Sequence, residues 1–241
     1  MTDFLTVLEK GLGELGVDLT ENQKEQYLKY LGLLTEWNQK VNLTAIKEER
    51  EIAVKHFLDS LAAGVYFNWH NQGKMLDLGS GAGFPGLVLK IWQPDKQIVL
   101  VDSVQKKVNF MNEVIEKLGL EGAIALHSRA EDLGRDGTHR QQYDMVMARA
   151  VAGVPVLCEY CLPLLAVGSY FYALKGPNYQ DELEAGEYAI KVLGGRIEEI
   201  INYDLPVEGD QRSLIIIKKV KPTPKEFPRK SGLPSKKPLI Q

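Results

Sequence analysis

The feature that most limits the fold of this chain is a glycine-rich segment that directly follows a short apolar run. The run, residues 75–78, contains Asp77, and the segment from Gly79 to Gly86 reads Gly-Ser-Gly-Ala-Gly-Phe-Pro-Gly. Glycine adopts the backbone conformations of tight turns and lets a ligand approach the main chain closely. We therefore predict a strand, a glycine turn and then a helix that begins near Pro85, since proline suits the first helical position.

Short apolar runs alternate with helical stretches along the rest of the chain. This alternation predicts an α/β fold, a Rossmann-like and mostly parallel sheet with helices on both faces. Two late runs flank a turn-like segment and predict a C-terminal antiparallel hairpin. The predicted strands cover residues 75–78, 98–101, 123–126, 145–148, 169–174, 197–205 and 214–219, and further helices are expected to begin near Val104, Val154 and Tyr179.

The first 70 residues show helical periodicity instead. Phe4, Leu8 and Leu12 fall on one helical stripe, and Thr20 with Gln23 predicts a capping box at the start of a second helix. We divide the chain into a small helical cap (1–70, with a third helix over 48–63), an α/β domain (71–221) and a basic tail (222–241).

The net charge of −3 conceals an asymmetry between the two ends of the chain. From Lys218 onward there are eight basic residues and one acidic residue, a net of +7, whereas the remainder carries −10. A basic arm favours phosphate binding, although a solvated tail that aids solubility has the same composition. The prolines and lysines of 222–238 predict a segment that is extended and mobile in isolation. The basic residues of this arm are Lys218, Lys219, Lys221, Lys225, Arg229, Lys230, Lys236 and Lys237.

The composition also bears on the compartment. None of the apolar stretches in the 241 residues approaches the roughly 20 residues of a membrane-spanning helix. The first residues, Met-Thr-Asp-Phe, lack the basic and apolar regions of a signal peptide. We therefore expect a cytoplasmic protein without membrane contact.

Cys158 and Cys161 have the spacing of a redox motif or of half a zinc site. Their apolar surroundings after Pro155 favour a buried helix instead, in which free cysteine acts as a small hydrophobic residue. The four histidines, including His70, show no ligand spacing. No metal is predicted.

The glycine segment admits two interpretations. Gly81, Gly83 and Gly86 satisfy the GxGxxG fingerprint of dinucleotide-binding dehydrogenases, and Asp102, at the end of the next strand, is placed for a ribose. Asp77 speaks against a dehydrogenase, because the dinucleotide loop normally leaves an apolar strand directly. With Asp77 the segment resembles motif I of the S-adenosylmethionine-dependent methyltransferases. In that case the glycines admit the methionyl part, the helix near Pro85 offers N–H groups to its carboxylate, and Asp102 accepts both ribose hydroxyls.

Segments along nearly the whole chain resemble one family, the glucose-inhibited division protein B family of small-subunit ribosomal RNA guanine-N7 methyltransferases. They lie at residues 37–46, 56–60, 79–86, 102–107, 129–131, 148–150 and 228–234. The resemblance implies the class I methyltransferase fold and cofactor contacts from Gly79, Phe84, Ala130, Glu131 and Arg149. From the residues alone, Glu131 could equally cap a helix. Arg149 could equally meet an RNA phosphate or a structural carboxylate. Many relatives have Tyr-Lys-Gly where this chain has Leu174-Lys175-Gly176, which puts an aromatic role at 174 in doubt.

The resemblance also implies the reaction, transfer of a methyl group from S-adenosylmethionine to N7 of a guanine in 16S ribosomal RNA. N7 carries an available lone pair, so no general base is required. We expect the target guanine beside Phe84, Arg149 and Lys175. The expected partner is 16S RNA or the small ribosomal subunit, held by the basic tail with help from Lys40, Lys47, Arg129 and Arg135, and the protein is expected to be a monomer. Deleting 222–241 is expected to weaken RNA binding and to leave cofactor binding intact.

Other functions remain open from the sequence. A methyltransferase for a small molecule or for another RNA shares the glycine loop. An NAD-dependent oxidoreductase shares GxGxxG, and a non-catalytic RNA-binding module shares the basic tail.

Overall fold

The computed structural model describes residues 3–67 and 73–240 and contains one sheet of seven strands in the order β3-β2-β1-β4-β5-β7-β6. The strands from β3 to β5 pair in parallel, and β7 lies antiparallel between β5 and β6. The mostly parallel sheet with a C-terminal hairpin is therefore confirmed. The strands are β1 (Lys74–Leu78), β2 (Gln97–Asp102), β3 (Ala123–His127), β4 (Tyr143–Arg149), β5 (Leu165–Lys175), β6 (Gly195–Asp204) and β7 (Gln211–Lys219).

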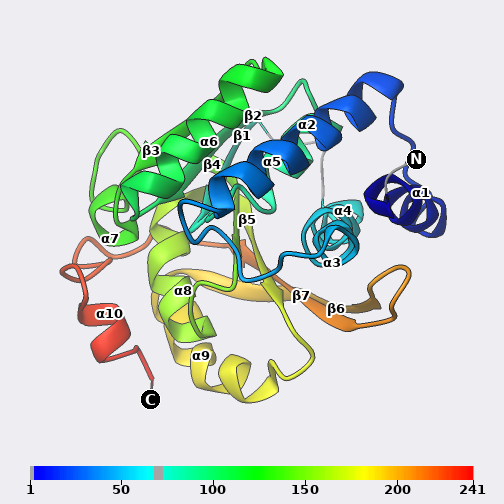
Figure 1. Cartoon of the computed structure of the whole chain (residues 1–241). Helices are drawn as coiled ribbons and strands as arrows, with labels where there is room; N and C mark the ends of the chain where they lie inside the picture. Colours follow the sequence, from blue (N-terminus) through cyan, green and yellow to red (C-terminus); the bar gives the residue numbers. More distant parts are fainter. Residues whose placement is uncertain (1–2, 68–72, 241) are drawn as a thin grey trace.

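Successive residues of each central strand enter different hydrophobic clusters, because side chains alternate across a sheet. Met75 and Met147 pack with the helices of one face, and Leu76 and Val146 pack with those of the other. Figure 1 shows the helices on both sides of the sheet. The first face is covered by α1 (Asp3–Leu15), α2 (Glu21–Asn38), α4 (Asp59–Val65), α5 (Gly86–Trp92) and α6 (Gln105–Leu118), and the second by α8 (Val154–Cys161) and α9 (Gln180–Val192).

The N-terminal helices share their core with the sheet. Thr20 and Gln23 form the predicted capping box at the start of α2. The third predicted helix is present as α3 (Glu49–Ile52), a π-helical turn (Ala53–Leu58) and α4 in continuous succession. Phe57 in the π-helical turn is fully buried among Phe4, Tyr27 and Phe84. The predicted boundary between cap and sheet domain at 70/71 lies outside the described residues, as do His70, the first two residues and Gln241, so the domain division stays a prediction.

The C-terminal segment, which composition predicts to be extended and mobile in isolation, packs against the body of the protein. It follows β7, returns along α7 (Ala130–Leu133) and ends in α10 (Leu233–Lys236) against α8 (Figure 1). The segment packs there because it carries partners for buried groups of the body, above all Arg229 for the fully buried Glu159. Within the described residues, no helix is both long and apolar enough to span a bilayer.

Candidate cofactor site and the residues around it

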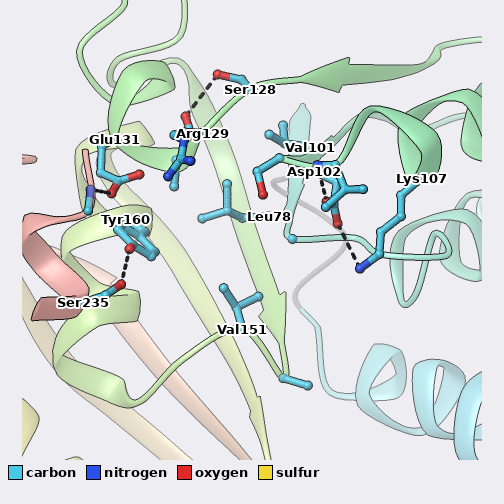
Figure 2. A pocket seen from close by; sticks show the side chains of 16 residues that line it. Leu78, Val101, Asp102, Lys107, Ser128, Arg129, Glu131, Val151, Tyr160 and Ser235 are labelled. Carbon is cyan, nitrogen blue, oxygen red and sulfur yellow. Dashed lines mark hydrogen bonds and ion pairs between the residues drawn. The ribbon is translucent and has the colours of Figure 1, made fainter. Parts of the chain in front are cut away.

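A pocket of about 320 Å³ opens at the carboxyl ends of β1, β2 and β4, within the usual range of about 300–1,000 Å³ for small-molecule sites. In a doubly wound sheet this edge is where ligands bind. Figure 2 shows Asp102 and Lys107 on one side of the pocket and Glu131, Tyr160 and Ser235 on the other. The pocket is lined by Leu78, Gly79, Val101, Asp102, Ser103, Val104, Lys107, Ser128, Arg129, Ala130, Glu131, Ala150, Val151, Tyr160, Gly232 and Ser235.

Gly79 lines the pocket directly after the end of β1. Its φ is +74°, a left-handed conformation that favours glycine, and a Cβ there would lie 2.4 Å from Cγ2 of Val151. Its N–H donates to Val101 O at 2.8 Å, which ties the loop to β2. The loop therefore presents bare main chain to the pocket, as its glycines predict.

The start of α5 is not available to a ligand in the way the sequence suggested. The Gly86 N–H donates to Asp77 Oδ2 at 2.9 Å, and the Leu87 N–H donates to Gly83 O at 2.7 Å. Asp77 thus occupies the helix start itself, and the prediction that α5 offers these N–H groups to the cofactor was wrong. Burial raises the pKa of Asp77 to about 7, and its Oδ1 has no hydrogen-bond partner.

Asp102 lies at the end of β2 and holds the glycine loop that follows β1 in place. Its Oδ2 accepts from the Gly81 N–H at 3.0 Å, and its Oδ1 accepts from the Val104 N–H at 2.8 Å. Lys107 Nζ lies 4.0 Å from Oδ2. A carboxylate offers about four acceptor positions, so two remain for hydroxyl groups of a ligand. The structure thus places Asp102 in the pocket, where the sequence predicts it.

Glu131 and Ala130 lie at the opposite end of the pocket, at the start of α7 after β3. Glu131 is 4% exposed, and its Oε1 accepts from the Gly232 N–H at 2.7 Å. Tyr160 Oη lies 2.8 Å from Ser235 Oγ nearby. Two residues of the C-terminal segment, Gly232 and Ser235, are therefore part of this pocket.

Phe84 and Arg149, which were expected to contact the cofactor, do not line the pocket. They lie on the face of the sheet that the N-terminal helices cover. The Phe84 ring is 4% exposed and is stacked between Tyr30, with centroids 5.3 Å apart, and His56, at 4.6 Å. The Arg149 guanidinium lies 5.5 Å from the same ring centroid. Both ring faces of Phe84 are thus covered by protein, its main-chain N–H donates to Ser80 O at 3.0 Å, and the residue does not line the pocket.

Arg149 belongs to a buried charged group that joins the sheet to the N-terminal helices. Its Nη1 donates to Asp59 Oδ2 at 2.7 Å and to Lys55 O at 3.1 Å. Arg212 Nε donates to Asp59 Oδ1 at 2.9 Å. Burial, together with the charge of Arg149, lowers the pKa of His56 to about 4, so His56 is neutral at pH 7. Of the alternatives open for Arg149, the contact with a structural carboxylate is present.

Lys175 does not share a pocket with Phe84 and Arg149. It lies at the end of β5 and points to the opposite face, where its Nζ donates to Glu182 Oε2 at 2.6 Å and to Ala152 O at 2.7 Å. The expectation that all three residues line one site for the target guanine was therefore wrong. The reason is the side-chain alternation of the strands, which the expectation ignored.

Two of the eight basic residues assigned to RNA are structural instead. Lys219 is fully buried; its Nζ donates to Leu162 O at 2.6 Å and to Leu193 O at 2.9 Å and contacts Thr223 Oγ1. Arg229 is paired with Glu159. For these two residues the prediction of phosphate contact was wrong. Lys218 is partly buried over the Tyr170 ring, and the exposed residues are Lys221, Lys225, Lys230, Lys236 and Lys237, with Lys40, Lys47, Arg129 and Arg135 elsewhere.

Cys158 and Cys161 are buried free thiols of α8, as their apolar surroundings predict. Burial raises the pKa of Cys158 to about 12 and that of Cys161 well above its usual range. Within residues 3–67 and 73–240, His, Cys, Asp and Glu side chains form no group of three that could hold a metal ion.

Several pocket residues were missed by the sequence analysis. Val104, Val151 and Tyr160 line the pocket from the loops and helix that follow β2 and β4. Their positions after predicted strand ends were the available signal. Gly232 and Ser235 had no such signal, because they reach the pocket only through long-range packing.

Comparison with known proteins places this architecture in one family. The family profile described as "GidB: rRNA small subunit methyltransferase G" matches residues 23–213. "Ribosomal RNA small subunit methyltransferase G" of Desulforamulus reducens is 49% identical over 99% of this chain and 100% of that protein. The protein of the same name from Pelotomaculum thermopropionicum is 48% identical over the same shares. The solved structure of TrmN from Thermus thermophilus, 15% identical, has a TM-score of 0.52 and covers 70% of this chain and 53% of its own, which supports the fold alone. The chain therefore belongs to the GidB family of rRNA small subunit methyltransferase G.

Proposed function

We propose that this protein transfers a methyl group from S-adenosylmethionine to N7 of a guanine in the 16S RNA of the small ribosomal subunit. One observation carries the proposal. In a chain of this family, the glycine loop and Asp102 lie together at a pocket on the ligand-binding edge of the sheet. The two relatives named ribosomal RNA small subunit methyltransferase G align with this chain over their whole length, which supports the same substrate class here.

The pocket suits an adenosyl cofactor in shape and in donor set. Val104 and Val151 are 44% and 37% exposed although they are large and apolar, and both line the pocket. A flat heteroaromatic ring over them removes apolar surface from water. When bound, S-adenosylmethionine supplies a methyl group on a positively charged sulfur.

We assign the polar contacts from the positions of the side chains. The two remaining acceptor positions of Asp102 receive the ribose hydroxyls, and the bare main chain at Gly79 receives the methionyl part. Ala130 and Glu131, at the far end of the pocket, contact the adenine edge. Phe84 and Arg149 support the cofactor site indirectly, because they hold the glycine loop against the N-terminal helices.

The chemistry requires little of the side chains beyond alignment. Guanine N7 has a free lone pair and needs no proton removed before attack, so the absence of a general base from the predicted residues suits this atom. Holding the nucleophile in line with the methyl group lowers the barrier by several kcal/mol or more, in the range of about 7–11 kcal/mol for ideal alignment. Arg149 and Lys175 point to opposite faces of the sheet and are each paired with a carboxylate, so we assign neither of them to the target base.

The exposed lysines of the C-terminal segment are proposed to hold the RNA backbone. Lys225, Lys230, Lys236 and Lys237 are exposed on the same segment that lines the cofactor pocket. Phosphate contacts of this kind give binding that weakens as salt is raised. They would place RNA beside the opening of the pocket, with the protein acting as a monomer.

The test is methyl transfer to purified small ribosomal subunits and to naked 16S RNA, followed by mass mapping of the methylated nucleotide. We expect one 7-methylguanosine, formed only with S-adenosylmethionine and strongly reduced in Asp102→Ala when the cofactor is limiting. Methylation at another atom, or of protein or small molecules only, would contradict the proposal. Equilibrium dialysis with labelled NAD provides the control for the dehydrogenase alternative, and we expect no binding.

A further inference from the structure

The C-terminal segment is fastened to the body of the protein by two arginines from outside it. Arg140 Nη1 donates to Phe227 O at 2.7 Å, and Arg140 Nη2 donates to Thr223 O at 2.9 Å and to Pro224 O at 3.2 Å. Arg135 Nε donates to Pro228 O at 2.8 Å. These bonds occupy main-chain carbonyls of residues 223–228, so this stretch follows a fixed path toward the pocket.

The stretch ends at a buried ion pair. Glu159, in the middle of α8, is fully buried, and Arg229 meets it with three donors. The Arg229 main-chain N–H donates to Oε1 at 2.7 Å, Nε donates to the same oxygen at 2.9 Å, and Nη2 donates to Oε2 at 2.6 Å. A buried carboxylate is tolerated only with such partners, because its removal from water costs several kcal/mol. Arg229 Nη2 also donates to Lys237 O at 2.7 Å, which closes the segment onto itself.

Beyond this pair the segment reaches the cofactor pocket. The Gly232 N–H donates to Glu131 Oε1, and Ser235 Oγ bonds with Tyr160 Oη. All four of these residues line the pocket (Figure 2). Gly232 has a φ of +80°, a left-handed turn that aims its N–H at Glu131. Because Gly232 follows so soon after Arg229 in the chain, the ion pair fixes the position of the pocket wall.

We propose that residues 229–235 form a wall of the S-adenosylmethionine pocket and that Arg229 is the positioning residue that holds this wall through Glu159. The proposal rests on the proposed cofactor site and extends it to a part of the chain that composition alone assigns to RNA. Arg229 acts on the cofactor through Gly232 and Glu131 and does not itself line the pocket. It follows that cofactor binding requires the C-terminal segment, contrary to the expectation that its deletion leaves cofactor binding intact.

The experiment uses full-length variants and calorimetric titration with S-adenosylmethionine. The double variant Glu159→Gln with Arg229→Gln removes both charges together, so that no unpaired charge stays buried. We expect the dissociation constant to rise roughly tenfold, the scale of one or two hydrogen bonds. Arg229→Lys keeps the positive charge but loses the paired donors of the guanidinium group. Its dissociation constant is expected to lie between those of the wild type and the double variant. Glu226→Gln, exposed on the same segment, is the matched control and is expected to bind as the wild type does.

A second readout separates positioning from a general loss of stability. Each variant is titrated well below its own melting temperature, and trypsin cleavage after Lys230 and Lys236, two sites that all variants retain, is followed with and without S-adenosylmethionine. In the wild type the cofactor is expected to slow this cleavage, and in the double variant the protection is expected to be lost. A double variant that melts earlier but binds the cofactor with unchanged affinity and protection would overturn the proposal.

Asp102→Ala distinguishes the cofactor site from the role of its wall. If it weakens binding while the double variant does not, the cofactor site stands and the role of residues 229–235 falls. If it leaves binding unchanged as well, or the wild type does not bind S-adenosylmethionine, both proposals fall.

Discussion

The Arg149 guanidinium donates to Oδ2 of Asp59 at 2.7 Å and thereby joins the end of β4 to α4, 90 residues earlier in the chain. Arg212 from β7 takes the other oxygen of the same carboxylate. One buried aspartate thus binds two arginines from separate strands. The sheet and the N-terminal helices are held together at this point, on the face of the sheet opposite Lys175.

Asp59→Asn is expected to lower the free energy of unfolding by about 3–5 kcal/mol, because it leaves two poorly exposed arginines without their carboxylate. Urea denaturation measures the loss. Glu51→Gln is the control, since it breaks the exposed pair of Glu51 with Lys55 and is expected to cost less than about 1 kcal/mol. Equal losses in the two variants would show that the Asp59 group does not stabilise the fold.

Asp102→Ala is expected to weaken S-adenosylmethionine binding by one to two orders of magnitude, roughly the value of charged hydrogen bonds to two hydroxyls. Asp102→Asn keeps the shape and is expected to lose less. Isothermal titration gives the dissociation constants, with Asp18→Ala, an exposed residue of the α1–α2 loop, as the unaffected reference. Wild-type affinity in Asp102→Ala would remove this residue from the site.

Stability is expected to fall as the pH is lowered from about 6.5 to 4, because of His56. Its pKa is about 4 in the folded protein, whereas the ordinary pKa of histidine, which applies to the unfolded chain, is 6.5. Between these two pH values the unfolded chain therefore binds more protons than the folded protein does. The stabilisation that depends on neutral His56 is fully present above pH 6.5 and is lost as the pH falls toward 4. The full effect is on the order of 3 kcal/mol.

The difference between wild type and His56→Gln isolates this contribution. Asp77, whose pKa burial raises to about 7, titrates in both proteins and acts in the opposite direction, since its folded form holds the proton longer. Urea unfolding at a series of pH values is the measurement. Parallel curves for the two proteins would contradict the assignment to His56.

Exposed and buried lysines near the C-terminus are expected to differ in their contribution to RNA binding. Replacing exposed Lys236 and Lys237 by alanine is expected to weaken RNA binding and to reduce the slope against log salt by roughly 0.7–0.9 for each phosphate that no longer has a lysine partner. Lys219→Met is expected to leave the slope unchanged, because Lys219 is fully buried. It is instead expected to lower stability, since the Leu162 and Leu193 carbonyls lose their donor. Filter binding at several salt concentrations tests both, and a reduced slope in Lys219→Met would contradict this division.

The sequence by itself determined the order of strands and helices, the glycine loop and the position of Asp102. These depend on local patterns, namely apolar periodicity, turn residues and the residue at a strand end, which lie in neighbouring positions of the chain. The tertiary structure alone decided that Lys219 is buried, that both faces of Phe84 are covered, and that Gly232 lies against Glu131, 101 residues away. Composition gives the charge of a segment but does not identify the groups that the segment contacts. Arg229 leaves the solvent because the buried carboxylate of Glu159 needs a charged partner, and only the folded chain brings the two together.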